Sequence, residues 1–192
     1  MKYIFNILIA ASLAFVACQG QKENATHEHG AEAKTEAPVD TVKKSIPKEE
    51  HAQVGGTHFM IKYHAPAVRG RTIWGGLVPY NEVWVTGAHS ATSIEIDKGI
   101  NINGTQVPAG KYALFTIPGK EKWTIVINRK WDQHLADEYD SKDDIVRTEV
   151  APEVLPSIQE RLKFSIADEG NSKASLNISW EKLKVSLPIQ LN

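Results

Sequence analysis

Ligand-binding side chains are concentrated between residues 69 and 89. This stretch contains two arginines, three large aromatic residues and one histidine: Arg69, Arg71, Trp74, Tyr80, Trp84 and His89. Arginine donates forked hydrogen bonds to anions, and a tryptophan ring offers a flat apolar face for stacking. Four glycines interrupt the stretch, so we expect loops, and loops held on a rigid sheet often carry function. The pattern predicts a binding site for an anionic or sugar ligand.

A structural role for the same side chains is the alternative prediction. The arginines would then pair with nearby carboxylates such as Asp97 or Glu95, and the tryptophans would fill the core. Residue types alone leave both possibilities open.

Histidines are the second group of side chains that could do chemistry. His64, His89 and His134 would form a metal site if the fold brought them together, because neutral imidazole binds zinc and copper. No His-x-His or His-x-x-x-His pair occurs after residue 50. The spacing therefore predicts no metal ligand set, and we predict no cofactor.

Known hydrolase motifs are absent from the sequence. It contains no Gly-x-Ser-x-Gly elbow, no His-Glu-x-x-His and no phosphate-binding Gly-x-x-x-x-Gly-Lys. An acidic run lies beside His134 and consists of Asp132, Asp137, Glu138, Asp140, Asp143 and Asp144. Two of these carboxylates could hydrolyse a glycosidic bond if the fold held them about 5 to 9 Å apart. Otherwise the run forms a solvated loop or a weak calcium site.

The N-terminal residues predict export and lipid anchoring. Lys2 precedes an apolar segment that runs to Val16-Ala17-Cys18, and this segment is too short to span a bilayer of about 30 Å. A single charge, a short apolar run and small residues before a cysteine are typical of a lipoprotein signal peptide, here residues 1–17. Cys18 would become the lipidated first residue and hold the protein on a membrane. We expect a location in the cell envelope, at the outer membrane, facing the periplasm or the cell surface.

Composition limits both the partners and the number of domains. The 22 basic and 23 acidic side chains nearly cancel, which argues against a nucleic-acid partner, because such proteins usually carry a cationic excess. Residues 18–54 contain no aromatic residue and few large aliphatics, so they predict a disordered tether. Residues 55–192 are long enough to bury a core and predict one globular domain.

The globular part predicts an all-β fold. Runs rich in Val, Ile, Thr, Phe, Tyr and Trp recur between turn signals, at 57–63, 72–77, 83–86, 92–96, 111–117, 122–128, 145–150, 162–166, 174–180 and 184–191. Asn103-Gly104 favours a type I′ hairpin turn. About ten short antiparallel strands predict a single β-sandwich or a flattened barrel.

The C-terminal part predicts a hairpin. Apolar and polar residues alternate over 175–180 and again over 182–187, as in strands with one buried and one wet face. Glu181-Lys182 would connect the two strands. The only predicted helical segments are 131–139 and 153–158, and both could be loop.

Several motifs resemble a known family. They are Tyr63-His64-Ala65-Pro66-Ala67-Val68-Arg69-Gly70-Arg71, Trp74-Gly75-Gly76-Leu77-Val78-Pro79-Tyr80, Val83-Trp84, Thr86-Gly87-Ala88, the run from Pro108 to Gly119, Trp123-Thr124-Ile125 and Trp180-Glu181. In this order and spacing they resemble the bacterial domain-of-unknown-function family 2911, over nearly all of residues 55–192. The chain departs from the family pattern at His89, where Asn is expected, and at Val85, where a basic residue is common. The resemblance implies an exported or lipid-anchored protein, and it supplies no catalytic residue.

These features together predict a lipid-anchored envelope protein that is not an enzyme. Its β-sandwich would bind a ligand or an envelope partner protein near residues 69–89, and Cys18 would hold it on the membrane. The alternative is a metal-dependent or carboxylate-based hydrolase that acts in the envelope through His64, His89, His134 and nearby carboxylates. An enzyme needs such groups to converge in a cleft.

Overall fold

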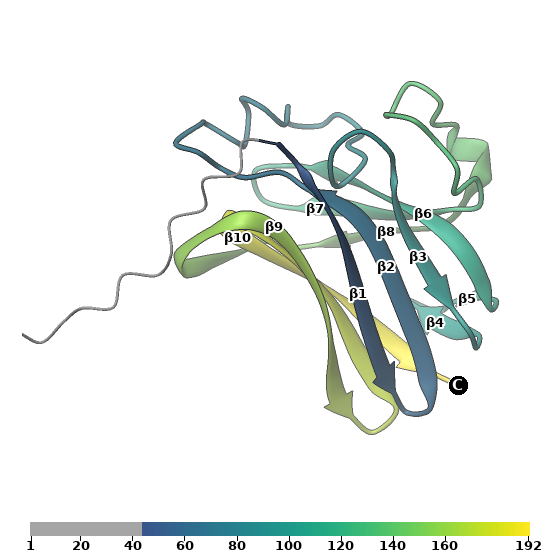
Figure 1. Cartoon of the computed structure of the whole chain (residues 1–192). Coiled ribbons are helices and arrows are strands. Elements are labelled where there is room, and N and C mark those ends of the chain that lie inside the picture. Colours follow the sequence, from purple (N-terminus) through teal and green to yellow (C-terminus); the bar gives the residue numbers. More distant parts are fainter. Residues whose placement is uncertain (1–43) are drawn as a thin grey trace, which may run out of the picture. The chain divides into compact units, whose positions relative to one another are not determined.

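The computed structural model describes residues 44–192, which form two antiparallel β-sheets packed against each other (Figure 1). The predicted all-β sandwich is confirmed. The larger sheet has the order β1 (Ile46–Val54), β2 (Thr57–Ala65), β3 (Thr92–Ile96), β6 (Gly110–Pro118), β7 (Trp123–Asn128) and β8 (Asp144–Val150). The smaller sheet has the order β5 (Thr105–Val107), β4 (Ile100–Ile102), β10 (Lys173–Leu191) and β9 (Glu153–Gly170). The only described helical element is the short 3-10 turn η1 (Ser141–Asp143).

The core lies between the two sheets. Alternate residues of each strand point inward, so Phe59 and Ile61 of β2 are completely buried together with Leu176 of β10. Full burial of one such side chain contributes about 1.5 to 3 kcal/mol. No helix within residues 44–192 is long and apolar enough to cross a membrane.

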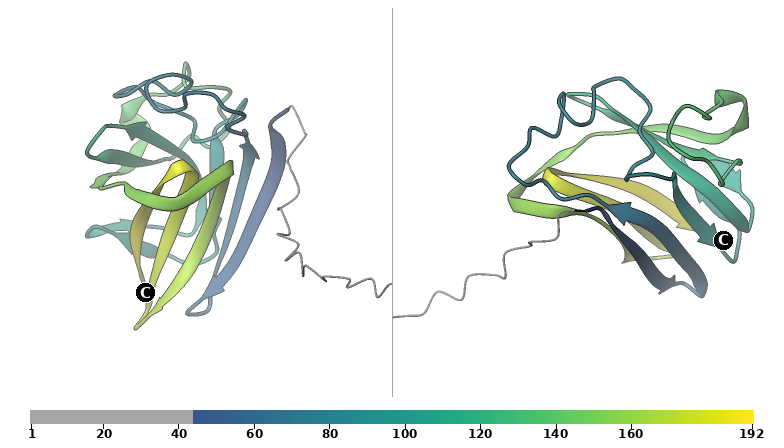
Figure 2. Two further views of the ribbon diagram at one scale, coloured as in Figure 1. Left: turned by 90° about the vertical axis from the view of Figure 1, so that its left-hand side faces the viewer. Right: turned by 45° about the horizontal axis from the view of Figure 1, so that its top comes forward.

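Strand β9 joins the two sheets along one side. Val68 N donates to Glu160 O at 2.8 Å, and Leu162 N donates to Pro66 O at 3.0 Å. The chain that continues from β2 is therefore hydrogen-bonded to the middle of β9. The β9–β10 ribbon consequently lies beside the β1–β2 hairpin (Figure 2), and the sandwich is closed along this edge.

The tether prediction is wrong for its last residues. Ile46–Val54 forms strand β1, which pairs with β2 along its whole length, from Ile46 with Ala65 to Val54 with Thr57. The inward positions of β1 include Lys48 and Glu50, and these charges weaken the apolar alternation that would have revealed a strand. The sequence feature that does indicate a hairpin here is Gly55-Gly56. These two residues form the turn between β1 and β2 with φ of 54° and 76°, and positive φ angles suit glycine. Residues 1–43, with the predicted signal peptide and Cys18, lie outside the described part.

The predicted C-terminal hairpin is also wrong, because β10 is one continuous strand. Buried apolar residues are even-numbered as far as Trp180 and odd-numbered from Val185 onward. A bulge at Glu181, with φ of 56° and a shift of register, absorbs the change of phase. Both halves of β10 thus face the same core. Its partner β9 includes residues 153–158, so the predicted helix there is a strand.

Two predicted strands are loops. Segments 72–77 and 83–86 make only isolated bridges, Trp74 with Val78 and Trp84 with Thr116. Segment 131–139, predicted as helix or loop, is a loop. Figure 1 shows that the chain between β2 and β3 and the chain between β7 and β8 gather at the same end of the sandwich. This end therefore carries the residues of the predicted site.

Removal of β1 is expected to destabilise the domain, whereas removal of residues 1–43 alone should not. A chain that begins at residue 55 loses buried Val54, whose burial is worth about 1.5 to 3 kcal/mol, and exposes the edge of β2. Its melting temperature should fall by at least about 3 °C, because 1 kcal/mol corresponds to about 2–4 °C in a domain of this size. Calorimetry of the chains beginning at 44 and at 55 checks this. Equal melting temperatures would show that β1 is dispensable.

Candidate functional site

A cluster of four tryptophans lies beneath the loop-bearing end of the sandwich. Trp84 stacks on Trp180 with ring centroids 5.7 Å apart and planes 21° apart. Trp74 contacts Trp84, Trp123 and Trp180 edge to face, with centroids 5.9, 4.7 and 5.8 Å away. Trp123 begins β7 of the larger sheet, and Trp180 lies on β10 of the smaller one. The cluster therefore fixes both loop tryptophans to both sheets.

A groove of about 300 Å³ opens above the stacked pair, and we name it the tryptophan groove. Trp84 and Trp180 lie at its floor, where Trp84 is half-buried and Trp180 is only 1% exposed, so Trp84 supplies the accessible aromatic surface. Its other principal lining residues are Arg69, Arg71, Leu77, His89 and Leu135. Leu77 and Leu135 are large apolar side chains that stay 47% and 40% exposed. The groove thus combines an aromatic floor, cationic groups and an apolar rim.

Four of the six predicted site residues line this groove together, namely Arg69, Arg71, Trp84 and His89. Trp74 lies in the cluster behind the floor. Tyr80 lines no part of the groove, and its ring instead packs on Gly75, where an added Cβ would come within 2.8 Å of it. The structure therefore brings together most of the predicted site.

For Arg71, the fold shows backbone carbonyls and not Asp97 or Glu95 as the partners of the guanidinium. Arg71 donates from Nε to Val68 O at 3.2 Å and from Nη2 to Ala67 O, so its guanidinium supports the backbone after β2. Arg69 N donates to Glu160 Oε1 at 2.9 Å. Asp97 lies beside the opposite end of β2, where it accepts from His58 N at 2.7 Å. The core role of the tryptophans holds in part for Trp74 and Trp84, which are half-buried and pack against the main core.

A family model described as a protein of unknown function (DUF2911) matches residues 45–189. The chain belongs to this family. No curated protein and no solved structure matches it. The DUF2911 match begins next to β1 and ends within β10, which agrees with the place of β1 in the folded domain.

The candidate histidines of this DUF2911 domain converge only in part. The rings of His64 and His89 meet edge to face with centroids 5.2 Å apart, and His134 forms a backbone bridge with Ser90. Burial, and secondarily the nearby His89, lower the pKa of His64. Within residues 44–192, no three His, Cys, Asp or Glu side chains are grouped so that they could hold a metal ion.

The backbone at His89 is in the left-handed conformation, which bears on the histidine found there. His89 adopts φ of 68°, in the left-handed region where Asn and His are better tolerated than most side chains. An Asn at this position would fit the same backbone. Val85, the other departure, is buried in a small apolar cluster with Ala113 and Phe115 on the outer face of the larger sheet.

Two members of the acidic run have structural contacts. Asp144 Oδ2 accepts from Tyr139 OH at 2.6 Å and from Arg147 Nη1 at 3.2 Å. Burial and this carboxylate raise the pKa of Tyr139 to about 12. Asp140 Oδ1 accepts from Lys142 N at 3.0 Å and caps η1. These contacts hold the loop between β7 and β8 in place.

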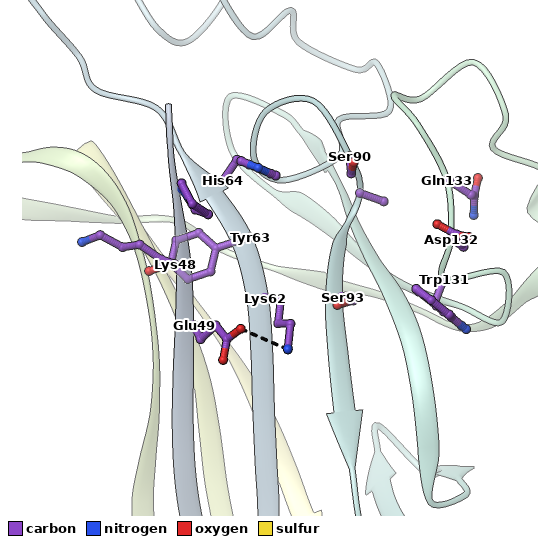
Figure 3. Close-up of a pocket in the computed structure, with 12 residues that line it drawn as sticks. Lys48, Glu49, Lys62, Tyr63, His64, Ser90, Ser93, Trp131, Asp132 and Gln133 are labelled. Carbon is purple, nitrogen blue, oxygen red and sulfur yellow. Dashed lines mark ion pairs between the residues drawn. The ribbon is translucent and has the colours of Figure 1, made fainter. Parts of the chain in front are cut away.

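A second groove, of about 550 Å³, lies on the outer face of the larger sheet, and we name it the outer groove (Figure 3). Side chains of β1, β2 and β3 line it on one side, and the segment 131–133 lines it on the other. Sequence reasoning missed this groove because it assigned β1 to the tether and Trp131 to a helix or loop without a partner. The sequence feature that could have indicated it is a tryptophan, Trp131, within a polar segment.

Proposed function

We propose that this DUF2911 protein is a lipid-anchored envelope protein that binds a small anionic ligand with an apolar face in the tryptophan groove. The observation that carries the proposal is the placement of Arg69 and Arg71 beside the stacked pair of Trp84 and Trp180. Charge-assisted hydrogen bonds from guanidinium groups fix an anion. The aromatic floor then accepts the apolar face of the same ligand.

The size and lining of the groove support a compact ligand. A volume of about 300 Å³ lies at the lower end of the range for small-molecule sites. Leu77 and Leu135 add apolar surface at the rim, while the two arginines supply charge. A uronic acid has these properties, because its carboxylate and the C–H face of its ring lie on one small molecule.

The lining favours binding over catalysis. No carboxylate, cysteine or lysine is among the described residues that line the groove, and His89 is the one described lining side chain of a type that commonly serves as a general acid or base. Arginine stays protonated and cannot act as a base. His89 therefore has no general acid or base partner within this lining, whereas glycoside hydrolysis typically uses a pair of carboxyl groups.

Cys18→Ser is expected to release the protein from the membrane. If Cys18 carries the acyl chains, serine at this position removes the anchor, and each buried methylene contributes about 0.8 kcal/mol to membrane binding. Detergent phase partitioning of cell extracts measures this directly: the wild type should enter the detergent phase and C18S the aqueous phase. Entry of C18S into the detergent phase would refute lipid anchoring at this residue.

Arg69→Gln is expected to weaken binding of glucuronate by about tenfold or more, because a hydrogen bond to a charged group contributes about 1.5 to 3 kcal/mol. Arg71 is less suitable, since its guanidinium supports two backbone carbonyls. Arg69→Lys keeps the charge and is the matched control, with an intermediate loss. Calorimetric titration with glucuronate, and with glucose as the uncharged counterpart, measures the effect. Equal affinity for the two sugars, or no loss in R69Q, would refute an anion site.

A further inference from the structure

We propose that the outer groove is a second binding site, which takes a neutral saccharide chain. The groove is the larger of the two, at about 550 Å³ against about 300 Å³. Figure 3 shows Trp131 and Asp132 on one side of it and Lys62 and Glu49 on the other, with Ser93 between them. The proposal concerns different residues from those of the tryptophan groove.

Trp131 supplies the stacking surface. It is the most exposed of the five tryptophans, with 42% of its surface accessible. Lys111 Nζ lies 3.6 Å from the centroid of its ring. The ammonium group holds the indole by a cation–π contact. A pyranose ring presents aliphatic C–H groups on one face, and these pack well on the electron-rich face of an aromatic ring.

Polar groups around Trp131 are available for the hydroxyls of a sugar. Ser90, Ser93 and Asp132 line the groove, and Ser90 and Asp132 are exposed to solvent. Ser93 is only 8% exposed, so its hydroxyl lies at the base of the groove. Hydroxyl and carboxylate groups both accept hydrogen bonds from sugar hydroxyls.

The outer groove holds few unpaired charges, which favours a neutral ligand. Lys62 Nζ forms an ion pair with Glu49 Oε1 at 3.0 Å. Lys48 lies at an inward position of β1, and Figure 3 shows its side chain pointing away from Trp131 and Asp132. Asp132 is then the remaining carboxylate of the lining; it disfavours an anion and can accept hydrogen bonds from sugar hydroxyls.

The wall that carries Trp131 is fixed before any ligand binds. Gln133 is buried, and its Nε2 donates to Asn128 Oδ1 at 3.2 Å. Ala91 N donates to Gln133 O at 3.0 Å, which ties the wall to the start of β3. A preformed wall lowers the entropic cost of binding. The open, sheet-borne shape suits several sugar units in a row better than one.

The test uses the indole N–H signals of the purified ¹⁵N-labelled protein, which has five tryptophans. The probes are cellohexaose, maltohexaose, xylohexaose and chitohexaose, with trigalacturonate as the charged probe. At least one neutral hexasaccharide should shift the Trp131 signal. Trp131→Ala should weaken binding of that sugar by at least tenfold, and Trp131→Phe should keep part of it, because a smaller ring remains for stacking.

Three results would overturn the proposal: no neutral probe shifts the Trp131 signal, the sugar binds W131A as tightly as the wild type, or trigalacturonate alone shifts Trp131. An unchanged melting temperature of W131A confirms that it is folded. The Trp84 signal reports on the tryptophan groove in the same spectra. Failure of glucuronate to move Trp84 would therefore count against the anion site and leave the saccharide site standing, and the reverse also holds.

Discussion

The stacking of Trp84 on Trp180 is the contact on which the rest of the loop-bearing end depends. Trp180 belongs to a sheet and Trp84 to a loop, so this contact fixes the loop by apolar burial and ring geometry. Backbone acceptors satisfy both indoles, with Trp84 Nε1 donating to Gly87 O and Trp180 Nε1 to Glu160 O. Nε1 of Trp74 and of Trp123 is buried without an acceptor among the described residues. Each unpaired donor costs about 1–3 kcal/mol. Burial and edge-to-face packing of the large indole rings offset this cost.

One wall then separates the two grooves. Leu135 N donates to His89 O, which joins the loop before β3 to the loop after β7. A small apolar cluster that includes Val85, Phe115 and Val126 packs these loops on the outer face of the larger sheet. One side of the joined loops faces the tryptophan groove through His89 and Leu135, and the adjoining residues Ser90 and Gln133 face the outer groove. The two grooves thus share one pair of hydrogen-bonded loops.

Much of the fold was predictable because strand signals are local. β2, β3, β6, β7 and β8 lie within two residues of the predicted runs, and Asn103-Gly104 makes the predicted turn with φ of 49° and 84°. β1 could not be recognised from its own residues, because charged residues occupy half-buried inward positions. Only its pairing with β2 identifies this segment as a strand. The bulge at Glu181 appears in the sequence as a change of phase in the apolar alternation, which a turn between two strands would also produce. Four of the six predicted site residues meet in one groove, since they are close in sequence. The outer groove could not be predicted, because β1 and Trp131 are about 80 residues apart and only pairing of distant strands brings them together.

A double-mutant cycle on Trp84 and Trp180 tests the central claim most directly, with leucine at each position so that the sites stay apolar. Urea unfolding gives the free energy of unfolding for the wild type, both single variants and the double variant. If the ring contact fixes the loop to the sheet, the two substitutions should be coupled by about 0.5 to 1.5 kcal/mol. Free energies that add within about 0.3 kcal/mol would show that the stacking does not hold this end of the molecule together.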